Sequence, residues 1–303
     1  MYRVDVAGLR QPLVLRVYSR RTASPDMAAP EMGSQDTVSR AAAVCRKEVD
    51  LHRLVAARVP VPEILYADFT GDAAIGPHVV MSWIEGLTFR EIKRRRDPDA
   101  VAACASAIGA VLARIGEFTF ERPGIIGPAL AIGAPLLDGE HPIPAFVEKC
   151  LTSPEFGRRM ELQDRACLRE FIWRCAPELA ALHGESALVH SDFGSPNLLV
   201  RPIGGRWTVT GVLDWEFAFS GPSLCDVGHM MRYERRATPK IEPHFSNSFR
   251  EHGGALPVNW RKLSRVLDLT ALCEFLTRPA LPASIVPEIL ELILATVEDR
   301  DPR

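Results

Sequence analysis

A polar loop between two short apolar runs, followed by a further apolar run, constrains the fold of this chain more than any other feature. The runs Ala187–Val189 and Leu198–Val200 enclose the loop His190-Ser191-Asp192-Phe193-Gly194-Ser195-Pro196-Asn197. After them come the turn Ile203-Gly204-Gly205, the strand pattern Trp207–Leu213 and Asp214. Two strand patterns joined by a glycine-containing turn predict a β-hairpin with the polar loop at its open end.

The register of this hairpin predicts which polar side chains meet. Pairing symmetric about Gly205 places residue 197 opposite residue 213, so Asn197 and Asp214 become neighbours. Asp192 lies a few residues upstream in the same loop. Carboxylate and carboxamide oxygens are the ligands that magnesium prefers in proteins, and magnesium carries the phosphates of nucleotides. The constellation therefore predicts metal-bridged phosphoryl transfer.

The same residues resemble a known family. The pattern His190-x-Asp192-x-x-x-x-Asn197, followed by Asp214, resembles the catalytic loop and metal-binding segment of aminoglycoside phosphotransferases and choline-kinase-like enzymes. The resemblance implies an α+β, bilobal protein-kinase-like fold, with ATP and Mg²⁺ as cofactors. It also implies that Asp192 accepts or orients the proton of an acceptor hydroxyl, that Asn197 and Asp214 hold magnesium, and that His190 supports the loop.

Two further acids near this segment have two interpretations each. Asp226 is either a helix cap or the counterpart of a family aspartate that braces the active-site loops. Glu216 is either a member of the site or a solvated residue at the end of a strand.

Residues 1–86 are predicted to form the small, β-rich, nucleotide-binding lobe. Strand patterns cover Tyr2–Val6, Leu13–Tyr18, Ile64–Phe69 and His78–Ile84, and a helical pattern covers Arg40–Ala57. Residues 19–39 lack any period and predict a mobile loop. Glu85 and Gly86 break the last strand pattern, which ends the lobe.

Arg16 interrupts an apolar strand, where an unpaired buried charge would be costly. Glu48 falls between Val44 and Leu51 on the inward face of the predicted helix, so it is the expected acidic partner. A basic strand residue paired with a helix glutamate is the arrangement by which kinases hold nucleotide phosphates. A purely structural ion pair is the alternative interpretation.

Residues 81–86 resemble the hinge of the same family. By that resemblance, backbone groups near Ser82 and Ile84 would contact the adenine of ATP. An ordinary buried strand followed by a turn is the alternative.

The chain departs from the family pattern in its first lobe. The family usually has lysine where Arg16 stands, which changes reach and hydrogen-bond geometry. Only about fourteen residues precede Arg16, and no glycine-rich loop is visible there, so the lobe is expected to be truncated at its start. Three explanations stay open: a start further upstream, phosphates covered by other parts of the chain, or weak activity.

Residues 87–303 are predicted to form the larger helical lobe, which carries the catalytic loop and the acceptor site. Asp97 and Pro98 predict the capped start of one helix, and a long helix is predicted over about 162–183 with Gly184 as its cap. Glycines and prolines recur between Arg122 and Pro144, which indicates a long connection and a candidate acceptor lid.

The composition argues against some classes of binding partner and identifies none. With 303 residues, a formal net charge of -2 and 47% hydrophobic residues, the chain has no broad field to attract nucleic acid or an anionic membrane. The basic run Lys93–Arg96 is interpreted as a solvated helix face. Seven scattered cysteines, no signal peptide and no long apolar run predict reduced thiols and a cytoplasmic protein. The oligomeric state and the choice between ATP and GTP stay open.

The acceptor is predicted to be a small molecule with a hydroxyl group, but two chemistries stay open. An aminoglycoside would need acids, for which the candidates are Glu216, Glu234, Asp268 and Glu274. A choline-like acceptor would need an aromatic cage, for which Trp215 and Tyr233 are the candidates. A non-catalytic nucleotide-binding pseudokinase is the rival function. A protein kinase ranks last because no activation segment ending in Ala-Pro-Glu follows Asp214.

Overall fold

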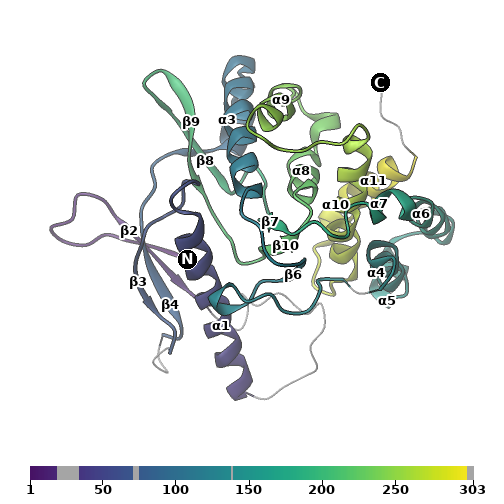
Figure 1. Cartoon of the computed structure of the whole chain (residues 1–303), viewed down its shortest axis with the longest axis horizontal. Helices are drawn as coiled ribbons and strands as arrows, with labels where there is room; N and C mark the ends of the chain where they lie inside the picture. Colours follow the sequence, from purple (N-terminus) through teal and green to yellow (C-terminus); the bar gives the residue numbers. More distant parts are fainter. Residues whose placement is uncertain (19–33, 71–74, 138, 299–303) are drawn as a thin grey trace.

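The computed structural model describes residues 1–18, 34–70, 75–137 and 139–298, and no side chain of residues 34–39 is described. Its first part is an antiparallel sheet with the strand order β1-β2-β4-β3 (Figure 1). The strands are β1 (Tyr2–Val4), β2 (Leu13–Val17), β3 (Ile64–Asp68) and β4 (His78–Ser82). All four follow the predicted strand patterns. The sequence between the last two strand patterns also predicts a turn at Gly71 and Asp72, and these residues lie outside the described part of the chain.

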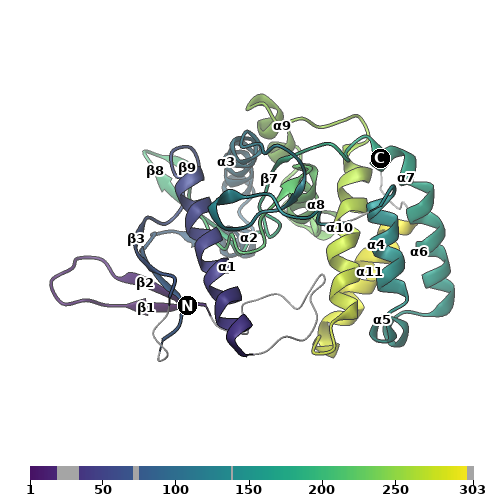
Figure 2. The same ribbon diagram turned by 60° about the horizontal axis from the view of Figure 1, so that its bottom comes forward.

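Helix α1 (Ser34–Val55) packs on the sheet and forms a small core with it (Figure 2). Cys45 and Val49 from the helix are fully buried against Val79 and Met81 of the central strand β4. The helix begins six residues earlier than the pattern from Arg40 predicted, so the end of the predicted loop 19–39 is helical. The remainder of that loop, residues 19–33, lies outside the described residues.

The rest of the chain is mostly helical, and it contains two short three-stranded sheets. One sheet has the order β6-β10-β7 and the other β5-β8-β9. The strands are β5 (Leu87–Thr88), β6 (Gly124–Ile125), β7 (Ala187–Val189), β8 (Leu198–Ile203), β9 (Arg206–Val212) and β10 (Phe219–Gly221). The α-helices are α2 (Phe89–Arg95), α3 (Pro98–Gly116), α4 (Pro142–Leu151), α5 (Pro154–Arg159), α6 (Leu162–Arg174), α7 (Ala176–Ala180), α8 (Leu224–Met231), α9 (His244–Glu251), α10 (Trp260–Thr277) and α11 (Val286–Val297). Single 3₁₀ turns cover Pro128–Leu130, Glu234–Arg236 and Ala283–Ile285.

Helix α3 is the central helix of this part. Asp97 caps it by accepting hydrogen bonds from the backbone N–H groups of Asp99 and Ala100, and Pro98 occupies its first turn, as predicted. Among the described residues, α3 alone has the length and apolar composition of a membrane span, and 61% of its most apolar window is buried in the fold. A core helix meets the same criteria, because it is apolar on most of its surface.

The long helix predicted over 162–183 is wrong. The segment forms two helices, α6 and α7, that meet at Cys175, and Gly184 caps neither of them. Pro177 has no backbone N–H and clashes with the preceding turn, so a continuous helix cannot pass through it. The seven cysteines are free thiols, as expected, and five of them are buried.

The β8–β9 hairpin has the predicted pairing near Asn197, but its turn position and a β-bulge differ from the prediction. Gly204 and Gly205 both have positive φ angles, 57° and 79°, and form a two-residue turn between Ile203 and Arg206. The turn is therefore centred between the glycines rather than on Gly205. A β-bulge between Leu199 and Val200 shifts the pairing by one residue, so Leu198 lies opposite Val212. Asn197 then lies beside Leu213, as predicted, and the backbone N–H of Leu213 donates to the carbonyl of Asn197 at 2.9 Å.

Candidate active site

The loop 190–197 leaves strand β7 at His190, which is fully buried. Its Nδ1 accepts a hydrogen bond from the backbone N–H of Asp192 at 3.2 Å, so the ring proton is on Nε2, which donates to the carbonyl of Leu213 at 3.0 Å. Burial lowers the pKa of His190 to about 4, which keeps the ring neutral at neutral pH. His190 therefore connects the loop to the end of β9 and acts as a support, and it does not line the cavity described below.

Asp226, in the first turn of α8, braces the same loop. Its two carboxylate oxygens accept hydrogen bonds from the backbone N–H groups of His190, at 2.7 Å, and Ser191, at 2.8 Å. Its side chain does not cap α8, so the helix-cap interpretation is wrong. Burial raises the pKa of Asp226 to about 7, and the two backbone N–H groups oppose that shift.

Asp192 is held from two sides by side chains. The amide nitrogen of Asn197 donates to its Oδ2 at 2.7 Å, and Nε2 of His229 lies 3.2 Å from its Oδ1. Burial alone would raise the pKa of Asp192, but these two partners outweigh it and hold the pKa below its usual value. The carboxylate is therefore ionised at neutral pH, and 37% of the side chain is exposed.

Sequence reasoning missed His229, which lies one helical turn after Asp226 on α8. The ring fits because residue 194 is glycine: a Cβ there would lie 3.3 Å from Cδ2 and Nε2 of His229. The spacing of three residues from Asp226 was the available signal, because residues three apart share a helix face.

Asp214 follows β9 with a φ angle of 70°, in the left-handed region that aspartate tolerates better than most residues. Ser191, directly before Asp192, also has a φ angle of 70°. Such backbone positions cost free energy and concentrate at functional sites. Of the five non-glycine residues with a positive φ angle in the described part of the chain, one therefore lies directly before Asp192 and one is Asp214.

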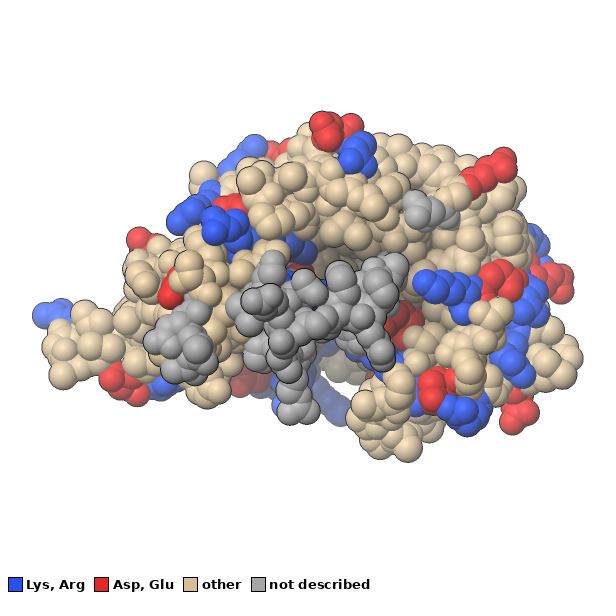
Figure 3. All heavy atoms as spheres, turned by 90° about the horizontal axis from the view of Figure 1, so that it is seen from below, with Lys and Arg blue, Asp and Glu red and all other residues tan. Residues whose placement is uncertain are grey.

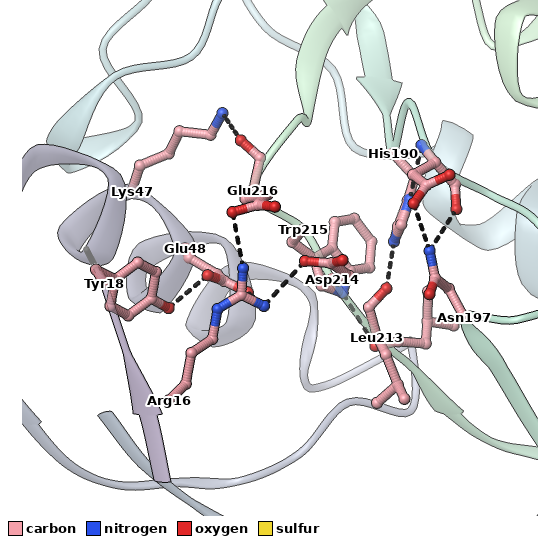
Figure 4. Close-up of polar contacts among 12 residues, drawn as sticks. Arg16, Tyr18, Lys47, Glu48, His190, Asn197, Leu213, Asp214, Trp215 and Glu216 are labelled. Carbon is pink, nitrogen blue, oxygen red and sulfur yellow. Dashed lines mark hydrogen bonds and ion pairs between the residues drawn. The ribbon is translucent and has the colours of Figure 1, made fainter. Parts of the chain in front are cut away.

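Arg16 and Glu48 form the predicted ion pair, with Arg16 Nη1 3.0 Å from Glu48 Oε1. Two further acids join it: Arg16 Nη1 lies 2.9 Å from Asp214 Oδ1, and Nη2 lies 2.9 Å from Glu216 Oε2 (Figure 4). The Tyr18 hydroxyl donates to Glu48. Burial opposes the charge of Arg16, but its acidic neighbours raise its pKa above the ordinary value. Glu216 is therefore a member of the site rather than a solvated strand end.

Lys47, the neighbour of Glu48 on α1, was also missed. Its Nζ donates to the backbone carbonyl of Glu216 at 2.7 Å. Burial lowers the pKa of Lys47 to about 8, and it raises the pKa of Glu216 to about 7. Helix α1 thus brings two side chains, Lys47 and Glu48, to the segment that follows β9.

The donor set fits magnesium. The amide nitrogen of Asn197 is committed to Asp192, which leaves its amide oxygen for a cation, and Asp214 supplies a partly exposed carboxylate. Among the described residues, no three His, Cys, Asp or Glu side chains are grouped so that they could hold a metal by themselves. Magnesium is commonly held by one or two protein oxygens, with water and phosphate completing its shell, so two such groups suffice.

The predicted hinge begins at the end of β4, an inner strand of the first sheet: Ser82 is its last residue, and Ile84 follows outside the strand. The backbone N–H of Ser82 donates to the carbonyl of Glu63 at 2.9 Å, and the Ser82 hydroxyl accepts from the N–H of Glu63 at 2.9 Å. The Ile84 side chain packs beside Gly211 of β9. The N–H of Ser82 is therefore already used, and a contact between this segment and adenine stays a prediction.

A cavity of about 600 Å³ opens beside Asp192 and lies between α1, α4, α10 and the segment after β9. Asp192, Lys47, Glu216 and His229 line one end of it. Figure 3 shows the hollowed face of the molecule on which acidic side chains are visible inside the recess. A cavity large enough for a small molecule therefore lies next to the site described above.

Of the acids predicted to meet an aminoglycoside, three line this cavity: Glu216, Asp268 and Glu274. Glu234 does not, because its carboxylate accepts hydrogen bonds from the backbone N–H groups of Ile241 and Glu242. The two aromatic candidates for a choline-like acceptor do not form a cage together. Trp215 is fully buried against His190, and Tyr233 lines a separate cavity beside α11.

Comparison with known proteins agrees with this geometry. The chain belongs to the phosphotransferase enzyme family, whose model matches residues 1–263. The fold is similar to that of aminoglycoside phosphotransferase APH(4)-Ia, with a TM-score of 0.66 and 18% identity over 98% of this chain and 89% of that one. A thermostable mutant of that enzyme, in a ternary complex with ADP and hygromycin B, gives a TM-score of 0.67 at 18% identity, over 99% of this chain and 90% of that one. The α+β, kinase-like fold expected from the sequence is confirmed.

Two further relatives limit what can be concluded from these similarities. The GDP complex of aminoglycoside 2'-phosphotransferase-IIIa gives a TM-score of 0.64 at 15% identity, over 88% of this chain and 85% of that one. A probable acyl-CoA dehydrogenase, IBR3 of Arabidopsis thaliana, is 24% identical over 203 residues, which are 65% of this chain. The chain spans 23% of the length of that curated relative.

Proposed function

We propose that this protein transfers the terminal phosphate of ATP to a hydroxyl group of a small molecule. One observation supports the proposal most strongly. Asn197 is hydrogen-bonded to Asp192 and lies beside Leu213, so Asp192, Asn197 and Asp214 all lie at the open end of one hairpin, and Asp192 faces a cavity. Family membership supports the reaction class, and the solved relatives with ADP and AMP-PNP support ATP as the donor.

Each residue has a chemical role in this proposal. Asp192 is ionised, so it can accept the proton of the acceptor hydroxyl as the oxygen attacks phosphorus. The donors on Asn197 and His229 fix the direction of its carboxylate. Arg16, held by Glu48, provides positive charge beside Asp214 for the phosphates. Magnesium, held by Asn197 and Asp214, supplies charge neutralisation of the phosphates when it is bound.

The proposal predicts acceptor-dependent formation of ADP. We expect purified protein with magnesium and ATP to form ADP in the presence of some members of a panel of hydroxyl compounds, which gain one phosphoryl group by mass spectrometry. Asp214→Ala should abolish this activity, because the metal loses its carboxylate ligand. The matched control is Asp164→Ala on α6, which should retain wild-type activity.

Two outcomes would contradict this proposal, the first in its site and the second in its reaction. Wild-type turnover by a correctly folded Asp214→Ala protein would remove Asp214 from the site. ATP binding without ADP formation across the whole panel would favour the non-catalytic pseudokinase instead.

A further inference from the structure

The face of α10 that lines the cavity is apolar at helical spacing. Leu267, Ala271 and Phe275 recur every four residues, so they form one stripe along the helix. Phe219 from β10 and Phe146 from α4 complete walls around the same volume. A ligand that fills this part of the cavity therefore contacts mainly aliphatic and aromatic side chains.

The two acids on the same face of α10 are already neutralised. Asp268 forms a bidentate pair with Arg232, at 2.6 and 2.7 Å, and both side chains are less than a tenth exposed. Glu274 forms a bidentate pair with Arg278, at 2.6 and 2.9 Å. Bidentate arginine–carboxylate pairs are strong and geometrically specific. An ammonium group entering the cavity would therefore meet two carboxylates whose charge an arginine already compensates.

The third acid in the cavity, Glu216, also has a basic partner. Glu216 pairs with Arg16, and the charge of Lys47 lies at its backbone carbonyl. Trp215 is buried and Tyr233 lies in a separate cavity, so neither can form a cage for a quaternary ammonium. Among the described residues, Asp192 is thus the lining carboxylate that has no arginine or lysine within ion-pair distance.

From this lining we propose that the acceptor is an uncharged alcohol with an apolar body, which lies along α10 with its hydroxyl at Asp192. The inference rests on the proposed phosphotransferase function and names its substrate class. The alcohol oxygen forms a bond to the terminal phosphorus of ATP, and the bond from that phosphorus to the bridging oxygen breaks. ADP leaves with the electron pair, and the hydroxyl proton passes to Asp192.

Binding of a series of alcohols tests the substrate class without nucleotide. Dissociation constants for 1-butanol, 1-hexanol, 1-octanol and 2-phenylethanol can be measured by ligand-observed NMR on the full chain. We expect affinity to rise about fourfold for each added methylene group, as burial of hydrocarbon predicts. Hygromycin B and choline serve as cationic probes and are expected to bind more weakly than 1-octanol. Tighter binding of either cation, or affinity independent of chain length, would overturn the proposal.

A cavity-filling variant tests the location. Ala271 faces the cavity from the middle of the apolar stripe, so Ala271→Phe should weaken 1-octanol binding by about tenfold or more because the added ring takes its place. Ala166→Phe is the matched control, because Ala166 is exposed on α6 and does not line the cavity. Equal affinity in Ala271→Phe and wild type would place the alcohol elsewhere and overturn the proposal. If Ala271→Phe fails to fold, the wild-type series still decides the substrate class.

These measurements separate the two proposals. Chain-length-dependent binding that is lost in Ala271→Phe, with no ADP formed from any alcohol, hygromycin B or choline, would reject phosphoryl transfer and keep the apolar site. ADP formation with hygromycin B or choline, and not with the alcohols, would keep the phosphotransferase and reject the apolar acceptor.

Discussion

Replacing Asp192 with asparagine is expected to lower kcat for phosphoryl transfer by about 10²–10⁴-fold, the range by which a positioned general base accelerates such reactions. The substitution keeps the size of the side chain and an oxygen that can accept the hydrogen bond from Asn197. It removes the charge that accepts the hydroxyl proton. Because Asp192 faces the acceptor cavity and is not assigned to the metal, the KM for ATP should change little.

Steady-state kinetics of Asp192→Asn and wild type, with an acceptor from the panel, measure this effect. Asp164→Asn, an identical chemical change on α6, controls for the loss of a carboxylate elsewhere. A folded Asp192→Asn protein whose kcat stays within about threefold of wild type would show that another group takes the proton.

Gly228→Ala is expected to destabilise the protein by about 2–3 kcal/mol, although alanine is the better helix former. Gly228 lies where α8 crosses α10, and a Cβ there would lie 2.2 Å from the backbone carbonyl oxygen of Ser264. A backbone atom cannot rotate away as a side chain can, so the two helices must separate. For a chain of this size the melting temperature should fall by about 3–5 °C.

The matched control is Gly116→Ala at the end of α3. A Cβ at Gly116 would lie 3.7 Å from Cβ of Ser223, which is ordinary van der Waals contact. Differential scanning calorimetry at one scan rate should therefore show an unchanged or slightly higher melting temperature for this variant. Equal melting temperatures for Gly228→Ala and wild type would contradict the close approach of α8 and α10.

Gly228 also links packing to the site, because it stands between Asp226 and His229 on α8. These two side chains hold the backbone and the carboxylate of the catalytic loop. Separation of α8 from α10 should move both, so Gly228→Ala is expected to lose activity as well as stability.

The sequence predicted the parts of the site that local pattern determines. The strand patterns and the glycine turn placed Asn197 next to Leu213, and Arg16 in an apolar strand required an acid such as Glu48. The β-bulge at Leu199 and Val200 could not be predicted, because one extra residue leaves the alternation of the flanking segments ambiguous. The turn is centred between Gly204 and Gly205 rather than on Gly205, and the β-bulge shifts the pairing by one residue. These two differences from the prediction cancel, so Asn197 still lies beside Leu213.

Most of the contacts that sequence reasoning missed depend on tertiary packing. His229 reaches Asp192 because α8 packs against the loop, and Glu216 reaches Arg16 because the segment after β9 passes β2. Neither pair has a local spacing rule. The arginine partner of Asp268 is also brought to it by helix packing, because Arg232 follows α8 and Asp268 lies on α10. Glu274 and Arg278, in contrast, are four residues apart, a spacing that could have been read from the sequence. The division of the chain at residue 86 stays a prediction.

The most direct test of the account is a crystal structure of the protein with magnesium and AMP-PNP. The account predicts a metal ion bound by the amide oxygen of Asn197 and the carboxylate of Asp214, with Arg16 beside the phosphates and the terminal phosphate facing Asp192. A nucleotide whose phosphates bind elsewhere, with no metal between Asn197 and Asp214, would contradict it.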